Sequence, residues 1–128
     1  MKNTSPTFSF RKRALSFKYA FQGIVGLIRA EHNAWIHTFA AVVAVTLGFL
    51  LNISVQEWIV VIILIALVLA GEAFNSAIEA LADHASDTIH PLIGKAKDFA
   101  AGGVLFLATA ALIVGCIIFI PKILLLFS

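Results

Sequence analysis

Three long apolar stretches dominate the pattern of hydrophobic and polar positions along the chain. No Asp, Glu, Lys or Arg occurs between residues 33 and 56, a second run is uncharged from Trp58 to Gly71, and a third run of 23 residues covers 99–121. A helix needs about 20 apolar residues to cross the hydrocarbon core of a bilayer. The pattern therefore predicts three membrane-spanning helices.

Two polar links separate the predicted spans. The first, residues 52–57, is short, and the second, residues 84–97, collects Ser, Asp, Thr, His, Pro, Gly and two Lys. Such a composition breaks a helix and favours water. We therefore expect the third span to begin near Phe99 and to end at Pro121–Lys122.

The segment before the first span has a helical pattern of its own. Its apolar residues recur on one face, and its polar and basic residues flank that face: Phe10, Ala14, Phe17, Phe21, Ile24 and Ile28, with Arg11, Lys18, Gln22 and Arg29 beside them. This pattern predicts an amphipathic helix lying in the headgroup region. Its cations either meet anionic lipid or bind a soluble anion, and composition does not separate the two.

Composition supports the same class. The 128 residues are 61% hydrophobic and 12% charged, and the mean hydropathy is +1.01, which excludes an ordinary water-soluble domain. The single cysteine, Cys116, excludes an intrachain disulfide. We expect an all-α membrane protein with an N-terminal surface segment, residues 1–31, and a three-span domain, residues 32–128.

Charge predicts how the spans are oriented. Six of the nine Lys and Arg lie in the first 29 residues, whereas the first link has none. Under the positive-inside rule the N-terminus is cytoplasmic. The second link, with Lys95 and Lys97, then returns to the cytoplasm, and the C-terminus with Lys122 lies outside.

Span two carries a polar stripe near its predicted cytoplasmic end. Its members fall on one helical face about 100° wide, namely Glu72, Asn75, Ser76, Glu79 and Asp83. An acid at the bilayer centre costs about 2.5–3.5 kcal/mol, so acids at that depth usually line a functional cavity or have a partner. Glu72 lies about 21 Å along the helix from Trp58, and the stripe therefore runs from lipid depth toward water.

Acids arranged in this way suit a reaction between a lipid and a solute from the cytosol. Glu72 can accept a proton, and Glu79 can stay ionised beside a cation such as Mg²⁺, which prefers oxygen ligands. Glu31, Lys97 and Asp98 are predicted at the same interface. The alternative is that these groups only pair with one another or reach out to water.

Common nucleotide and metal motifs do not occur in the sequence. There is no phosphate-binding glycine loop and no His-Glu-x-x-His arrangement, so a nucleotide would be held by other means. The four histidines lack metal-ligand spacing, and we expect them to be interfacial anchors. No nucleic-acid partner is expected.

Several segments together resemble the signature of the small prokaryotic diacylglycerol kinase family. They are GEAFNSAIEALAD at 71–83, HPL at 90–92, KAKDFAAG at 95–102 and FKYAFQG at 17–23, with Glu31 after the last of these. The likeness extends from about Ser16 to Ile120. It implies an ATP-dependent lipid kinase in the plasma (inner) membrane of a bacterium, assembled as a homotrimer with composite sites between subunits.

The resemblance also implies roles for individual residues. Glu72 matches the general base, and Glu31 and Glu79 match the carboxylates that hold Mg²⁺ on the ATP phosphates. The implied ATP contacts are Lys12, Tyr19, Glu31, Asn75, Glu79, Asp83, Ser86, Asp87, Thr88, Lys97 and Asp98, and the implied lipid contacts are Glu72 and Ser76. Arg11, Lys12 and Arg13 compete for the N-terminal phosphate contact, and the spacing to Tyr19 favours Lys12.

The lipid is a separate question. The segment from Glu31 to His37 is more similar to the undecaprenol kinase branch than to the enterobacterial branch, which has an acid at the position of His37. Undecaprenol is therefore favoured slightly over diacylglycerol. The rival class is a non-enzymatic oligomer that conducts protons or ions, but the outer half of span two lacks the polar side chains that such a path needs. A purely structural partner would leave the stripe unexplained.

Overall fold

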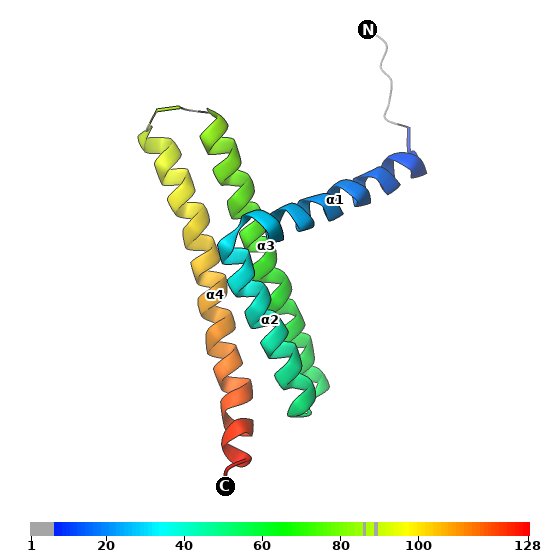
Figure 1. Ribbon diagram of the computed structural model, residues 1–128, viewed down its shortest axis with the longest axis vertical. Coiled ribbons are helices and arrows are strands. Elements are labelled where there is room, and N and C mark those ends of the chain that lie inside the picture. Colours follow the sequence, from blue (N-terminus) through cyan, green and yellow to red (C-terminus); the bar gives the residue numbers. More distant parts are fainter. Residues whose placement is uncertain (1–6, 86, 89) are drawn as a thin grey trace.

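The computed structural model describes residues 7–85, 87–88 and 90–128, and within these residues the chain is helical without strands. Its helices are α1 (Phe10–Ala30), α2 (His32–Leu50), α3 (Val55–Ala85) and α4 (Pro91–Leu125). Helices α2, α3 and α4 form a bundle, and α1 leaves the bundle at a steep angle (Figure 1). Within the bundle α3 packs most extensively against α4, less against α2, and α2 barely touches α4.

The three bundle helices are long and apolar enough to cross a membrane. Many of their large apolar side chains are exposed, including Phe39, Leu105 and Phe106. Exposed apolar surface on this scale is what a bilayer or a neighbouring subunit covers. The prediction of an all-α membrane protein with three spans and a surface helix is confirmed.

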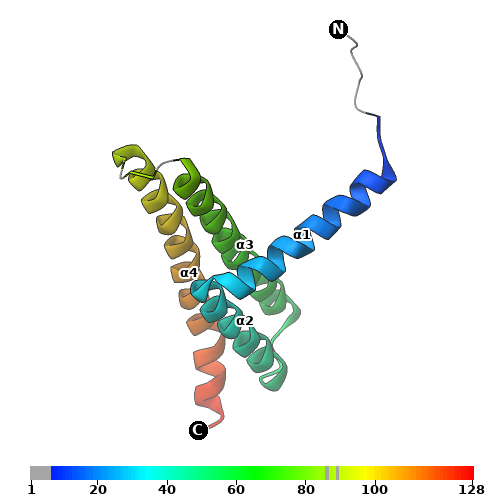
Figure 2. The same cartoon turned by 45° about the horizontal axis from the view of Figure 1, so that its top comes forward.

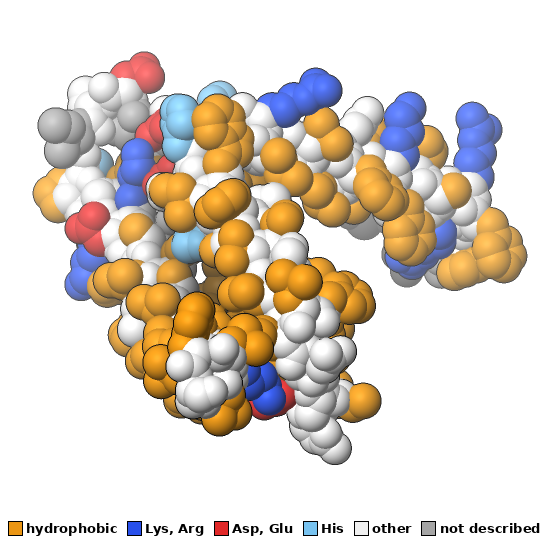
Figure 3. All heavy atoms as spheres, turned by 60° about the horizontal axis from the view of Figure 1, so that its bottom comes forward, with side chains coloured by type: hydrophobic (Ala, Val, Ile, Leu, Met, Phe, Trp, Pro, Cys, Tyr) orange, Lys and Arg blue, Asp and Glu red, His pale blue; other side chains and the backbone are white. Residues whose placement is uncertain are grey.

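Helix α1 presents an uncovered apolar face. The Ser9 hydroxyl caps its N-terminus by accepting a hydrogen bond from the backbone of Lys12 at 3.4 Å, and the aromatic side chains of Phe10, Phe17 and Phe21 are exposed. In Figure 3 most Lys and Arg side chains of α1 stand on the edge turned away from the bundle, with apolar side chains on the edge turned toward it. This is the arrangement expected of a helix lying on the membrane surface.

The junction between α1 and α2 is a single extended residue, Glu31, with φ −106° and ψ 114°. The indole Nε1 of Trp35 on α2 donates a hydrogen bond back to the carbonyl of Ile28 on α1. The rings of His32 and Trp35 also meet edge to face, with centroids 4.8 Å apart. Of these two contacts, the Trp35 hydrogen bond ties the last turn of α1 to the first turn of α2, and the ring contact lies within α2.

At the opposite end of the bundle a tight turn joins α2 to α3. Asn52 adopts the left-handed conformation with φ 49°, which Asn tolerates better than most residues. A reciprocal cap then starts α3, because the Ser54 backbone donates to Glu57 at 2.8 Å and the Glu57 backbone donates to the Ser54 hydroxyl at 3.2 Å. Glu57 also pairs with Lys122 on α4 at 3.4 Å.

A small hydrophobic core lies next to this turn. Its buried members are Ile53, Val61, Ile118 and Phe119, with Trp58 packed against them. Gly48 on α2 allows Trp58 to approach, since a Cβ at position 48 would lie 2.6 Å from the indole ring. The core therefore holds the three spans together at the end of the bundle where α2 turns into α3.

The third span is longer than predicted. Helix α4 begins at Pro91 rather than near Phe99, and it continues through Pro121 to Leu125. His90 caps it by accepting a hydrogen bond from the Leu92 backbone at 3.2 Å, and Pro91 stands in the first turn, where a missing N–H does no harm. The prediction that residues 84–97 break the helix was wrong from residue 91 onward, because capping by His90 favours a helix start at Pro91.

The early start of α4 gives the bundle a projecting end. Figures 1 and 2 show the α3–α4 hairpin extending past the point where α1 joins α2. About 13 residues of α3 follow Glu72, or roughly 20 Å of helix. The hairpin end therefore stands beyond the level at which α1 lies.

Candidate active site

The polar stripe of α3 runs from the buried interior to the surface. Glu72 is 2% exposed and Asn75 is 8% exposed. Ser76 and Glu79 are half-buried, and the Asp83 side chain is 70% exposed. One helical face therefore presents acids at successive depths.

The side chain of Glu72 on α3 is buried and faces α2. The Nε2 atom of His37 on α2 lies 3.0 Å from the Glu72 Oε1 atom. Within the described residues that oxygen makes no aligned hydrogen bond. A buried carboxylate is costly unless it is paired, and His37 is the partner that the fold places beside it.

The next turn of α3 holds polar atoms that are free to bind a ligand. The Asn75 side-chain amide donates to Glu79 Oε1 at 3.2 Å. This leaves Asn75 Oδ1 and Ser76 Oγ buried, and neither has a hydrogen-bond partner in the described part of the chain. Buried polar atoms are normally satisfied in a working protein, so these two atoms point to a missing ligand.

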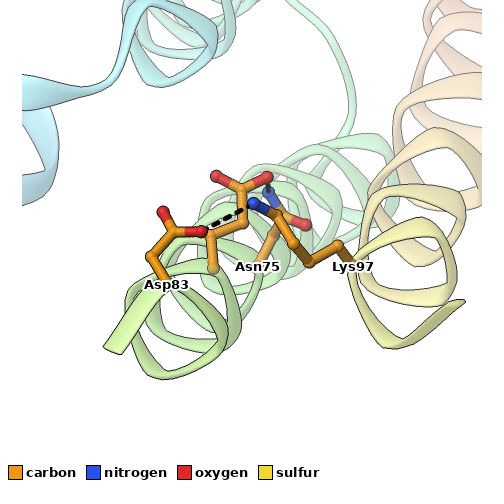
Figure 4. A network of polar contacts seen from close by, with 4 residues as sticks. Asn75, Asp83 and Lys97 are labelled. Atoms are coloured by element: carbon orange, nitrogen blue, oxygen red, sulfur yellow. Dashed lines mark hydrogen bonds and ion pairs between the residues drawn. The ribbon is translucent and has the colours of Figure 1, made fainter. Parts of the chain in front are cut away.

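A cation reaches the outer part of the stripe from α4. The Lys97 Nζ atom lies 2.8 Å from Asp83 Oδ1, and the Glu79 carboxylate also attracts this ammonium. Figure 4 shows Lys97 extending from α4 toward Asp83, on the side of α3 that carries Asn75. Asp98, the next residue of α4, is exposed. Carboxylates, an amide and an ammonium thus gather at one end of the bundle.

The predicted N-terminal contacts lie apart from this group within one chain. Lys12 and Tyr19 belong to the N-terminal half of α1, which Figures 1 and 2 place well away from α3 and α4, and Tyr19 is 64% exposed. Glu31 stands half-buried at the α1–α2 junction. Asp87 and Thr88 lie in the connection between α3 and α4, and Ser86 falls outside the described residues.

The described residues do not gather three or more His, Cys, Asp or Glu side chains around one point where a metal ion could sit. Mg²⁺ does not require such a cage, since it keeps several waters and is commonly bound by one or two carboxylates and substrate phosphates. Glu79 and the unpartnered Asn75 Oδ1 supply oxygen atoms of this kind. The donor set therefore fits Mg²⁺ held jointly with a phosphate.

An apolar groove of about 690 Å³ runs between α2 and α4, with α3 as its floor. Along α2 it extends from Ile36 to Leu47, or about 16 Å. Its lining is apolar apart from His37 and the thiol of Cys116. The groove thus ends beside the residue that pairs with Glu72.

Comparison with known proteins decides the family. Residues 18–119 match the model of the prokaryotic diacylglycerol kinase family. The chain belongs to this family. It is therefore a membrane lipid kinase, with ATP and a lipid as its substrates.

Some relatives of the chain are named undecaprenol kinase and others diacylglycerol kinase. The chain is 40% identical to the undecaprenol kinase of Bacillus subtilis over 107 residues, which are 84% of this chain and 87% of the relative. It is 36% identical to the diacylglycerol kinase of Synechocystis over 111 residues, 86% of this chain and 63% of the relative. With the diacylglycerol kinase of Escherichia coli K12 it shares 34% over 79 residues, 62% of this chain and 65% of the relative.

The contact of His37 with Glu72 was not among the predictions, since the four histidines were expected to be interfacial anchors. The sequence does mark His37 as a candidate functional residue, since it is a titratable side chain inside an otherwise uncharged predicted span. What the sequence lacks is the register between α2 and α3. Only the packed helices place His37 at the depth of Glu72.

Proposed function

We propose that this lipid kinase transfers the γ-phosphate of ATP to the hydroxyl of a membrane lipid alcohol, with Glu72 as its general base. One observation carries the proposal: Glu72 is 2% exposed, on the polar stripe that leads to Lys97. Its neighbour His37 lines an apolar groove. A lipid in the groove and a nucleotide on the stripe would thus meet at Glu72.

Phosphoryl transfer depends mainly on positioning the nucleophile and neutralising charge on the transferred group. In our proposal the negative charge of Glu72 draws the proton from the lipid hydroxyl, and Ser76 binds the lipid at the same depth. Lys97 stabilises the charge of the phosphates from the water-facing end. The hydroxyl oxygen forms the new bond to phosphorus as the bond to ADP breaks.

Glu31 and Glu79 would hold Mg²⁺, and Asn75 would complete the oxygen set. When bound, this ion neutralises charge on the ATP phosphates. The remaining proposed nucleotide contacts are Lys12, Tyr19, Asp83, Ser86, Asp87, Thr88 and Asp98. The unpartnered Asn75 Oδ1 beside Glu79 supports this assignment.

The assembly we propose is a homotrimer with sites shared between subunits. The N-terminal half of α1, to which Lys12 and Tyr19 belong, lies well away from α3 of its own chain (Figures 1 and 2), so α1 of one subunit can reach the stripe of another. The exposed apolar faces of the bundle helices also leave room for such packing. One chain buries the Glu72 end of the stripe but leaves the Asp83 side chain 70% exposed, so a neighbouring subunit would complete the enclosure.

In the plasma membrane of a bacterium, the N-terminus and the α3–α4 connection would face the cytoplasm and the C-terminus the outside. Residues 1–31 form the surface segment and residues 32–128 the three-span kinase domain. The basic residues of α1 support this orientation. The Glu57–Lys122 pair then lies at the outer interface.

Undecaprenol is the lipid that we favour over diacylglycerol. The groove has an apolar lining with one strongly polar side chain, His37, at its end, which suits a lipid with a single hydroxyl. Diacylglycerol would bring two ester groups into surroundings that lack partners for them, and unpaired polar groups are costly to bury. The identity to a relative named undecaprenol kinase supports the same choice.

The test uses purified protein in mixed micelles with labelled ATP and Mg²⁺, offered undecaprenol and diacylglycerol in parallel. We expect labelled phosphate on undecaprenol and at least about tenfold less on diacylglycerol. Labelling of diacylglycerol alone would reverse the choice of lipid. Labelling of neither lipid would contradict the proposed reaction.

A further inference from the structure

Small residues on two helices keep the apolar groove open. Where α2 and α4 face each other across it, the lining includes Ala40, Ala44, Ala111 and Gly115. Side chains this short do not bridge the two helices, which barely touch each other. The groove therefore depends on side-chain size, and a larger residue at one of these positions would fill it locally.

The groove has one polar end and one closed apolar end. At the polar end, the His37 side chain lies 3.0 Å from Glu72. At the other end, the lining residues Val61 and Phe119 also belong to the buried core beside the turn from α2 to α3. A lipid whose hydroxyl lies at the depth of Glu72 can therefore extend its chain along the groove for about 16 Å before it meets the core.

The width of the groove decides what can occupy it. A volume of about 690 Å³ spread over about 16 Å of helix gives a mean cross-section of roughly 40 Å². An α-helix with its side chains is about 10 Å across and occupies roughly 80 Å². A hydrocarbon chain therefore fits the groove, and a helix of a neighbouring subunit does not. The side of the groove is open, since the lining residues Ile36 and Phe39 are 65% and 72% exposed, so a longer chain can leave it into the surrounding lipid.

Gly115 on α4 provides the space in the inner part of the groove. On the same helix Leu107 lies against Gly71, the neighbour of Glu72, and Gly115 follows Leu107 by eight residues, or about 12 Å. None of the described atoms around Gly115 lies within 4 Å of a Cβ added there. Because Gly115 lines the groove, a larger side chain at this position would occupy the space that a lipid chain needs.

We infer that the groove holds the first part of a single lipid chain, and that Gly115 is a specificity-determining residue, which sets how much of that chain is held. This inference rests on the proposed kinase reaction and specifies its lipid. An extended chain advances about 1.2 Å per bond, so about 16 Å accommodates about 13 carbons in line, or about three isoprene units. The enzyme then recognises the isoprene units nearest the hydroxyl, and the rest of a longer prenol lies in the bilayer.

The first experiment offers wild-type protein a series of prenols of increasing length, at equal mole fractions in mixed micelles with labelled ATP and Mg²⁺. The series is geraniol, farnesol, geranylgeraniol and undecaprenol. The apolar tail leaves one apolar environment for another, so selection depends on packing contacts within the groove. We expect kcat/KM to rise at least about fivefold from geraniol to geranylgeraniol, and to differ by less than about threefold between geranylgeraniol and undecaprenol.

The second experiment compares Gly115→Leu with the matched control Ala110→Leu. Ala110 is exposed on the same helix and does not line the groove. In Gly115→Leu the ratio of kcat/KM for undecaprenol to that for geraniol should fall at least about fivefold, because the added side chain takes up the inner groove. The control should keep the wild-type ratio, and both variants should keep the KM for ATP. Leucine favours a helix more than glycine does, and melting temperatures check that both variants fold.

Cys116 reports occupancy of the groove without turnover. It is the single cysteine of the sequence, and it is exposed and lines the groove. Undecaprenol added without ATP should slow the reaction of wild-type Cys116 with N-ethylmaleimide at least about fivefold, since access to the thiol controls its reactivity.

Three results would overturn the inference. One is a prenol series in which kcat/KM does not rise up to geranylgeraniol, or rises about threefold or more beyond it. Another is the same ratio of undecaprenol to geraniol in Gly115→Leu and Ala110→Leu. The third is a Cys116 reaction rate that undecaprenol leaves unchanged. Failure of the proposed function is recognised separately, because wild-type protein would then label none of the four prenols.

Discussion

The ammonium of Lys97 on α4 lies 2.8 Å from the carboxylate of Asp83 on α3. Both side chains are substantially exposed, at 38% and 70%, and exposed pairs of this kind contribute little to stability. Their joint position at the water-facing end of the stripe instead suits an ammonium held ready for a phosphate. Lys97 is therefore expected to matter more for catalysis than for folding.

Replacing Lys97 with Met tests this expectation. The variant should lose activity by a factor on the order of 10², because a preorganised charge near the transferred phosphate is removed. Its melting temperature should stay near that of the wild type. The control is Lys122→Met, which removes the cation of the ion pair at the other end of the bundle and should keep wild-type turnover. Equal turnover in the two variants would remove Lys97 from the site.

Removal of Mg²⁺ tests the proposed role of the carboxylates. Excess EDTA should abolish phosphate transfer, and added Mg²⁺ should restore it. In Glu79→Gln the Mg²⁺ concentration for half-maximal activity should rise at least about tenfold, since an anionic oxygen ligand is lost. A titration of activity against free Mg²⁺ measures this. An unchanged midpoint would show that Glu79 does not hold the ion.

A bulky residue in the groove should compete with the lipid. Ala40 lines the groove on α2 and is exposed, so Ala40→Phe should raise the lipid KM roughly tenfold while leaving the KM for ATP unchanged. Val42, which is 59% exposed and does not line the groove, provides the control Val42→Phe. Equal lipid KM values in both variants would place the lipid elsewhere.

Gly48 should be the glycine whose replacement harms folding most clearly. A Cβ there would lie 2.6 Å from the rigid indole of Trp58, whereas none of the surroundings of Gly102 comes within 4 Å of its added Cβ in the described structure. Gly48→Ala should cost about 1–3 kcal/mol of stability and lower the melting temperature. Gly102→Ala serves as the control and should leave the melting temperature unchanged. A Gly48→Ala protein as stable as Gly102→Ala would contradict the close packing of α2 on Trp58.

Patterns within one helix were readable from the sequence, and relations between helices were not. The spacing of Glu72, Asn75 and Asp83 places them on one face whatever surrounds the helix, and the structure shows their expected gradient of burial. The contact of His37 with Glu72 depends on how α2 and α3 are aligned along the membrane normal, and no spacing along the chain reports that alignment. The start of α4 was missed for a local reason, because capping by His90 and Pro91 outweighed the polar composition that follows.

The most direct test of the account replaces Glu72 with Gln and measures transfer of labelled phosphate from ATP to undecaprenol. The amide keeps the shape of the side chain and removes its negative charge, so turnover should fall by a factor on the order of 10² or more. Glu57→Gln, a matched change in the first turn of the same helix, should leave turnover at the wild-type level. Wild-type turnover in the Glu72→Gln protein would contradict the central claim that this buried carboxylate drives the reaction.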